Sequence, residues 1–246
     1  MRHGTMDWLA LLAFGDTGWG DELLHGLGVT LALSLATFPV AIFLSFVIHW
    51  AKTSKRRPVR VVAHGYTTIF KTLPEILTLL ILYYQSQAVV NWVADLVMPG
   101  SHLSVSPFLA GLIALSLVIS AYGSEVVRGS LNAIGKGQTE AAQALGLSRF
   151  QTFRKILLPQ LWRHALPGFG NLWVILLKDT SLVSIIALSD LVHVATLAIN
   201  TTREPFFFYL VIGGIYILLV ALSTRLQKTL ERRASTGISP VEARDV

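Results

Sequence analysis

Long apolar runs separated by short polar stretches dominate the hydrophobic pattern of this chain. Four long windows contain no Asp, Glu, Lys or Arg, and a fifth contains only the adjacent pair Lys178 and Asp179. A membrane-spanning helix needs about 20 mostly apolar residues, so each window is long enough to cross a bilayer. The pattern predicts five spans, over residues 24–50, 73–95, 107–128, 165–189 and 205–229.

A polar stretch, residues 129–164, separates the third predicted span from the fourth. Within it, Thr139 can cap a helix whose first turn carries Glu140, because a carboxylate there complements the positive end of the helix dipole. Gly146 suits the left-handed position that ends such a helix. We therefore expect a short helix followed by an elbow at Gly146.

A second short helix is expected directly after the elbow. Ser148 and Gln151 have the spacing of a capping box, and Pro159 is expected to end the helix. The whole unit has three interpretations: an amphipathic surface loop, a DNA-binding helix-turn-helix, or a docking surface for a soluble partner. DNA binding is disfavoured because both flanks return to the membrane and no second recognition surface is present. The surface loop and the docking surface remain equally compatible with the pattern.

Composition and charge support a membrane protein. Hydrophobic residues make up 53% of the chain and charged residues 14%, against about a quarter charged in soluble domains. This predicts an all-α integral membrane protein and excludes a disordered chain. Lys and Arg cluster after the first and last predicted spans and within residues 129–164, so the positive-inside rule places the N-terminus outside and the C-terminus inside. The chain has no cysteine, which excludes thiolate-metal chemistry.

The polar stretch carries a motif that resembles the EAA motif of the membrane subunits of bacterial ABC importers. The matching positions are Glu140, Ala141, Ala142, Gly146, Ile156, Leu158 and Pro159. Three further segments are similar to segments of the same family: "YTTIFKTLPEILTLLILYYQ", "AYGSEVVRGSLNAIGKGQTEAA" and "LKDTSLVSII". The resemblance covers nearly all of residues 22–233 and points to the polar amino-acid group, in particular Q-type permeases for histidine, for lysine, arginine and ornithine, and for opines.

This resemblance implies one permease domain over residues 1–246, with a type I ABC importer (MetI-like) fold, in the bacterial inner membrane. The implied partners are a homologous M-type permease subunit or a second copy, two cytosolic ABC ATPase subunits, a periplasmic amino-acid-binding protein and membrane lipid, but no nucleic acid. The EAA segment would be the coupling helix that docks on an ATPase. The chain itself is expected to bind no cofactor, since ATP and Mg²⁺ would belong to the ATPase subunits and no Walker-type phosphate loop is present.

Ionisable residues at membrane depth are candidate substrate ligands, because they are costly unless they face a cavity or a partner. Glu75 can pair with a cationic ligand group or with Lys71, one helical turn earlier. The resemblance favours the ligand, since histidine-type Q subunits carry a carboxylate at this position whereas many relatives carry an apolar residue. The predicted substrate-binding residues are Glu75, Asp179, Thr180, Ser181 and Tyr84.

Lys178 and Asp179 predict a break in the fourth span. Thr180 and Ser181 are expected to cap a new half-helix, whose free amides would attract a charged end group of the substrate while Glu75 binds its basic side chain. The alternative is that Lys178 and Asp179 pair with the other permease subunit. Glu125 and Arg128, spaced for an ion pair on one helix face, and Lys178 are assigned structural or gating roles.

Taken together, these features predict a non-enzymatic transport subunit of an ATP-driven importer for a basic polar amino acid (histidine, arginine, lysine or ornithine) or an opine, working by alternating access. A permease for glutamine or glutamate and a non-transporting membrane scaffold remain alternatives. An intramembrane enzyme would need convergent catalytic residues, which the sequence does not show, and a passive channel would not need the EAA segment. The histidines lack metal-ligand spacing, so no metal site is expected.

Overall fold

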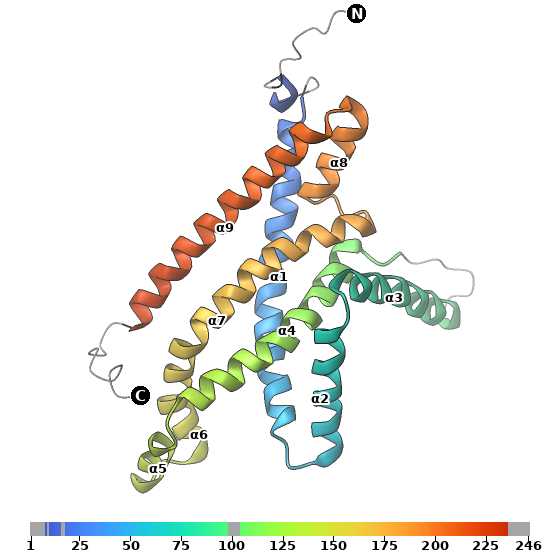
Figure 1. The fold of residues 1–246 in the computed structure, drawn as a ribbon. Helices are drawn as coiled ribbons and strands as arrows, with labels where there is room; N and C mark the ends of the chain where they lie inside the picture. Colours follow the sequence, from blue (N-terminus) through green and yellow to red (C-terminus); the bar gives the residue numbers. More distant parts are fainter. Residues whose placement is uncertain (1–7, 9, 16–17, 98–103, 236–246) are drawn as a thin grey trace, which may run out of the picture.

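The computed structural model describes residues 8, 10–15, 18–97 and 104–235, and every regular element in these ranges is a helix (Figure 1). In chain order the elements are η1 Ala10–Leu12, α1 Gly20–Lys52, α2 Arg57–Thr72, α3 Glu75–Val97, α4 Pro107–Ala133, α5 Lys136–Ala144, α6 Arg149–Thr152, η2 Phe153–Leu157, α7 Leu158–Asp179, η3 Thr180–Ile186, α8 Leu191–Thr202 and α9 Pro205–Ser235. Helix α1 lies centrally and contacts α2, α4, α7 and α8.

Four helices are each long and apolar enough to cross a membrane: α1, α4, α9 and the continuous helix Arg149–Ile186. Helices α2 and α3 meet that test only as a pair, and they bend by 115° at Pro74. Each of the five predicted spans coincides with a helix of this set, although the crossing by α3 stays a prediction. Helix α8 was not predicted; it lies in the connection between the last two predicted spans.

Helix α1 packs partly through small and polar side chains. Thr30, Ser34 and Ser45 are buried on its inner face, and each hydroxyl donates to the carbonyl four residues earlier. Gly123 of α4 lies so close to Ser45 that a Cβ at this glycine would overlap the Ser45 hydroxyl. Small residues at the contact let membrane helices approach closely, which explains why α1 and α4 form the central pair of the bundle.

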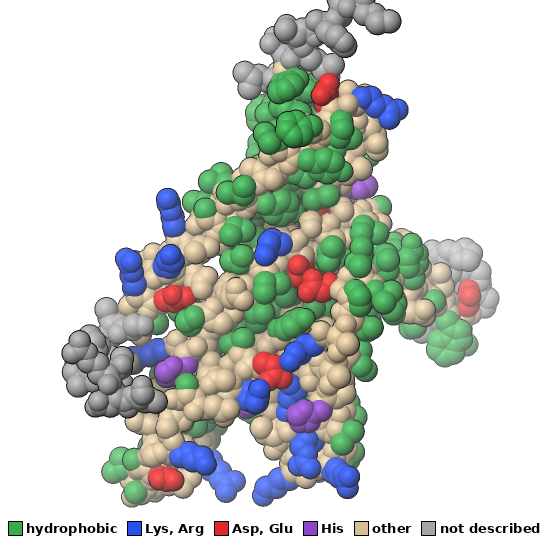
Figure 2. All heavy atoms as spheres, in the orientation of Figure 1, with side chains coloured by type: hydrophobic (Ala, Val, Ile, Leu, Met, Phe, Trp, Pro, Cys, Tyr) green, Lys and Arg blue, Asp and Glu red, His purple; other side chains and the backbone are tan. Residues whose placement is uncertain are grey.

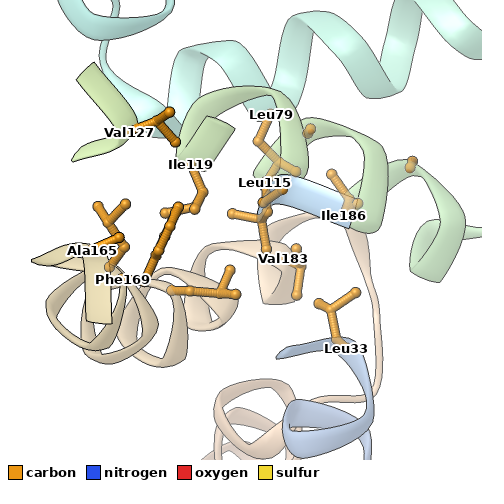
Figure 3. Close-up of a cluster of buried hydrophobic side chains, with 14 of the residues drawn as sticks. Leu33, Leu79, Leu115, Ile119, Val127, Ala165, Phe169, Val183 and Ile186 are labelled. Atoms are coloured by element: carbon orange, nitrogen blue, oxygen red, sulfur yellow. The ribbon is translucent and has the colours of Figure 1, made fainter. Parts of the chain in front are cut away.

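Apolar side chains form two buried clusters in the described part of the chain. The larger one joins α1, α4, α7 and η3 through residues such as Leu33, Ile119, Phe169 and Val183 (Figure 3). The smaller one joins α1, α8 and α9, with Phe208 fully buried. This packing fixes the junction where α7 ends, and with it the candidate residues around Asp179.

Candidate substrate and coupling sites

Two carboxyl groups from distant parts of the chain meet where α3 begins and α7 ends. Glu75 is the first residue of α3 and Asp179 the last of α7, and their side chains lie within hydrogen-bonding reach of each other. Asp179 Oδ2 is buried without a hydrogen-bond partner among the described residues. Figure 2 shows acidic side chains between α7 and the start of α3, bordered largely by apolar ones. The structure thus brings together the two acids that were predicted to bind the same substrate.

No ion pair in the described part of the chain neutralises this acid pair. The sequence alternative, a Lys71–Glu75 pair, is not formed: Lys71 Nζ lies 3.7 Å from Glu125 Oε1 instead. Pro74 ends α2, so Lys71 and Glu75 lie on helices that diverge by 115°. Lys178 is exposed and next to Asp179 on the same helix. Adjacent helical side chains do not face each other, so Lys178 forms no ion pair with Asp179.

The predicted half-helix at Thr180 is wrong. Helix α7 passes into η3 without a break, and no side chain caps η3. Thr180 is fully buried and its hydroxyl donates to the Leu177 carbonyl, while the Ser181 hydroxyl donates to the Lys178 carbonyl. Both hydroxyls bond backward along the helix, so the backbone stays continuous and no free helix N-terminus forms there.

The helix start in this region lies about ten residues later, at α8. Its N-cap is Asp190, whose Oδ1 accepts from the His193 N–H at 3.0 Å. Asp190 is fully buried, and its Oδ2 has no hydrogen-bond partner among the described residues. An Asp directly before an apolar run is an ordinary N-cap signal, so the start of α8 at Asp190 could have been predicted from the sequence.

Tyr84 does not join the acid pair. It lies nine residues beyond Glu75 on α3, a distance of about 13 Å along the axis and about half a turn around it. Its ring is 63% exposed and contacts Tyr83. Of the five predicted substrate residues, the structure therefore brings Glu75 and Asp179 together and leaves Tyr84 apart.

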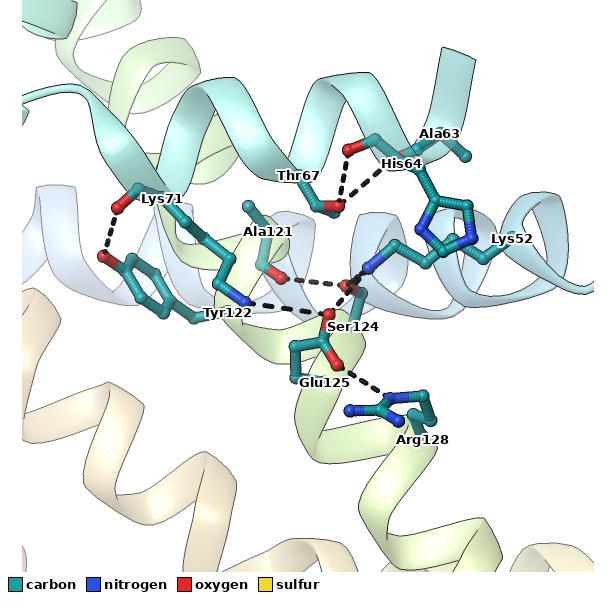
Figure 4. A network of polar contacts seen from close by, with 10 residues as sticks. All are labelled: Lys52, Ala63, His64, Thr67, Lys71, Ala121, Tyr122, Ser124, Glu125 and Arg128. Atoms are coloured by element: carbon teal, nitrogen blue, oxygen red, sulfur yellow. Dashed lines mark hydrogen bonds and ion pairs between the residues drawn. The ribbon is translucent and has the colours of Figure 1, made fainter. Parts of the chain in front are cut away.

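Glu125 lies in a separate network, where α1, α2 and α4 meet (Figure 4). Lys52 Nζ lies 2.8 Å from Glu125 Oε1 and 3.2 Å from the Ser124 hydroxyl. Arg128 Nε lies 2.8 Å from Glu125 Oε2, and Lys71 completes the set of cations. The predicted Glu125–Arg128 pair is confirmed. The contacts of Lys52 and Lys71 with Glu125 were not predicted, because partners this far apart in the chain leave no local pattern.

Helix α5, the first of the two short helices expected in the EAA segment, ends in the predicted elbow. Gly146 has a φ of +75°, its N–H donates to the Gln143 carbonyl at 2.9 Å, and the Leu147 N–H donates to the Ala142 carbonyl at 3.0 Å. This bond pair is a Schellman motif, for which glycine is favoured at the left-handed position. The predicted start is wrong, however: α5 begins at Lys136 after Gly135, so Thr139 lies inside the helix and does not cap it.

The second short helix of the EAA segment, which we call the second coupling helix after its expected role, starts as predicted but does not stop at Pro159. Ser148 and Gln151 form both bonds of a capping box, at 3.3 Å and 2.9 Å. The helix then runs through η2, which is a π-helix, into α7, so Ile156, Leu158 and Pro159 lie within one helix that extends to Ile186. Proline is tolerated in the first turn of a helix, and the wider π turn before it moves the carbonyl that would otherwise clash.

Exposed side chains at the elbow leave a surface for a partner. Glu140 and Ala141 are exposed, whereas Ala142 is buried. Leu145 and Phe150, on either side of Gly146, are 81% and 69% exposed, which is high for such large apolar side chains. The segment thus presents an apolar surface with one carboxylate, joined directly to the helix that ends at Asp179.

Comparison with known proteins gives consistent matches. Residues 28–236 match the family described as binding-protein-dependent transport system inner membrane component. The chain is 35% identical over 233 residues to the octopine transport system permease protein OccQ of Rhizobium meliloti, covering 95% of this chain and 98% of that protein. It is 38% identical over 221 residues to the histidine/lysine/arginine/ornithine permease protein HisQ of Salmonella typhimurium, covering 90% and 96%. It is 39% identical over 220 residues to the arginine ABC transporter permease protein ArtQ of Escherichia coli, covering 85% and 92%.

Solved structures share the fold. An amino acid ABC transporter with histidines matches with a TM-score of 0.78 and 27% identity, covering 94% of this chain and 100% of that chain. An inward-facing structure of the MetNI methionine ABC transporter matches with a TM-score of 0.70, covering 87% and 96%. Its identity is 15%, so the second match supports the fold alone.

Proposed function

The chain belongs to the family of binding-protein-dependent transport system inner membrane components and is a multi-pass inner-membrane permease subunit of an amino-acid or opine ABC importer; we propose that its cargo is a basic polar amino acid or a related opine. The observation that carries this proposal is the acid pair Glu75–Asp179, which forms no ion pair with a cation in the described part of the chain. The names of two relatives, for histidine/lysine/arginine/ornithine and for arginine, agree with such a cargo.

Electrostatics explain why the acid pair suits a cationic cargo. Two adjacent carboxylates in a poorly solvated site repel each other, and each loses part of its hydration. A cationic side chain such as a guanidinium relieves both costs, since it can bond each carboxylate. A neutral side chain such as that of glutamine cannot supply the charge, and a glutamate would add a third negative charge. The pair therefore discriminates by charge.

The exposed surface around Gly146 supports the proposed coupling to an ATPase. Glu140 can pair with a basic group of the ATPase groove, and Leu145 and Phe150 can be buried on docking. Because the second coupling helix continues as α7, a movement at the elbow reaches Asp179 through one uninterrupted helix. This continuity is a direct mechanical connection between nucleotide-driven movement and the acid pair, as alternating access requires.

The assembly and topology follow from the same proposal. We assign five crossings with the N-terminus outside and the C-terminus inside, with the α2–α3 pair as the second. The partners are an M-type permease or a second copy, two ATPase subunits that bind ATP and Mg²⁺, and a periplasmic binding protein. The chain's own role is to bind, orient and release the amino acid, without covalent chemistry and without a cofactor of its own.

Reconstitution tests the importer assignment. We expect ATP hydrolysis by the assembled complex in proteoliposomes to rise when both the binding protein and a basic amino acid are added. Hydrolysis that does not respond to either would overturn the assignment of a coupled importer. This measurement does not depend on which residues bind the cargo.

A charge-neutral substitution tests the cargo site. Glu75→Gln should lower uptake of arginine, lysine or histidine by about tenfold, because a hydrogen bond to a charged group contributes about 1.5–3 kcal/mol. Assembly with the ATPase should be unchanged. Asp95→Asn is the matched control, since Asp95 is an exposed acid near the far end of the same helix. Uptake in Glu75→Gln that equals uptake in the control contradicts the assignment.

A further inference from the structure

A groove between α7 and α9, with α1 as its third wall, has an apolar interior. This cavity has a volume of about 320 Å³. Its lining includes Leu35, Phe38, Ile42, Phe169, Trp173 and Leu226. The described residues do not fill this groove, so its apolar lining is open to a lipid or protein that lies beside the bundle. An occupant of this part must itself be apolar.

The groove continues into a second cavity of about 460 Å³ with basic residues. Arg163 from α7 and Arg233 from α9 line this second cavity. Both cavities share Trp162, Leu166 and Leu230, so they form one continuous groove that is apolar at one end and basic at the other. Basic side chains also gather along the lower half of α9 (Figure 2).

We propose that this groove binds an anionic phospholipid of the cytoplasmic leaflet. An acyl chain occupies the apolar part, and the phosphate lies between Arg163 and Arg233. Charge complementarity favours this occupant, since basic pockets between membrane helices on the cytoplasmic side bind anionic headgroups. Trp162 lies at the boundary of the two parts, the depth at which tryptophan is favoured in membranes. The positive-inside distribution places the basic end on the cytoplasmic side.

The position of the groove gives this lipid a consequence for coupling. One wall is α7, which continues without interruption from the second coupling helix. A lipid wedged between α7 and α9 therefore contacts the same helix that a docked ATPase moves. The inference is independent of the cargo, because the groove contains neither Glu75 nor Asp179.

Lipid retention by the assembled importer tests the basic end. The complex is purified from mixed phosphatidylglycerol and phosphatidylethanolamine, and bound lipid is counted by native mass spectrometry. The double variant Arg163→Gln/Arg233→Gln should lower phosphatidylglycerol retention by about fivefold to about thirtyfold, at about 1 kcal/mol per basic residue. Phosphatidylethanolamine retention should change little. The control Arg225→Gln/Lys228→Gln removes two charges from α9 outside both cavities.

A polar substitution tests the apolar end. Leu230→Gln should lower retention of both lipids, because Leu230 lines both parts of the groove. Leu222→Gln is the matched control, since Leu222 is an exposed leucine of α9 that lines neither cavity. Equal phosphatidylglycerol retention in the arginine variant and its control overturns the proposal. So does a complex that retains no lipid at this position because the other permease subunit covers the groove.

Discussion

Two groups of acidic residues in this molecule have opposite surroundings. Glu125 is held by Lys52 and Arg128 at 2.8 Å and by Lys71 at 3.7 Å. Glu75 and Asp179 face each other, and no described cation forms an ion pair with either. A carboxylate that already has its cations gains nothing from a cationic ligand, whereas the acid pair does. This difference, and not the presence of acidic residues alone, is the reason why we propose the acid pair as the cargo site.

Replacing Lys52, the buried cation beside Glu125, should remove much of the difference between the two acidic sites and have the largest effect on stability. The Lys52 side chain is 7% exposed, so Lys52→Met leaves Glu125 with its two more exposed partners, Lys71 and Arg128. Breaking a buried ion pair costs about 3 kcal/mol or more, so we expect a clear drop in the thermal unfolding midpoint of the purified complex.

The double variant Lys52→Met/Glu125→Met provides the control for this prediction. It removes both charges and should recover most of the lost stability, because the single variant suffers mainly from a carboxylate that has lost its buried cation. If the double variant is less stable than Lys52→Met, the network does not act through charge compensation.

Neutralising one member of the acid pair should have the reverse effect and sharpen the comparison. Asp179→Asn removes the repulsion with Glu75, so stability should stay the same or rise. Uptake of a basic amino acid should fall by about tenfold, because the cation loses one charged acceptor. Unfolding midpoints and initial uptake rates, measured beside the Asp95→Asn control, check both parts. A large loss of stability would show that the pair has a structural cation that our assignment lacks.

Features set by neighbouring residues were predictable from the sequence. The left-handed Gly146 and the capping box of Ser148 and Gln151 both formed as expected, because each depends on bonds within a few residues. The meeting of Glu75 and Asp179 was also expected, but on a different ground: ionisable residues at membrane depth have few stable places other than a shared polar site.

Features set by tertiary packing were not predictable. Lys52 and Glu125 are 73 residues apart, and no local pattern connects them. Thr180 was expected to cap a helix because threonine often does, but its burial between packed helices favours the bond to its own helix carbonyl. Pro159 was expected to end a helix, and the π turn before it made continuation possible. Tertiary context decided all three.

Removing Arg128, an exposed partner of Glu125, should have the smallest effect on stability. The difference from Lys52→Met then measures what the buried cation contributes. Arg128 has a side chain that is 62% exposed and lies one helical turn from Glu125. Helical pairs of this kind contribute about 0.2–0.5 kcal/mol, and salt screens them. Arg128→Gln should therefore shift the unfolding midpoint only slightly at low salt and not measurably at high salt, whereas the loss in Lys52→Met should persist. If the two variants lose equal stability at high salt, the buried Lys52 contributes no more to the Glu125 network than the exposed Arg128, and burial of the cation does not explain the stability of this network.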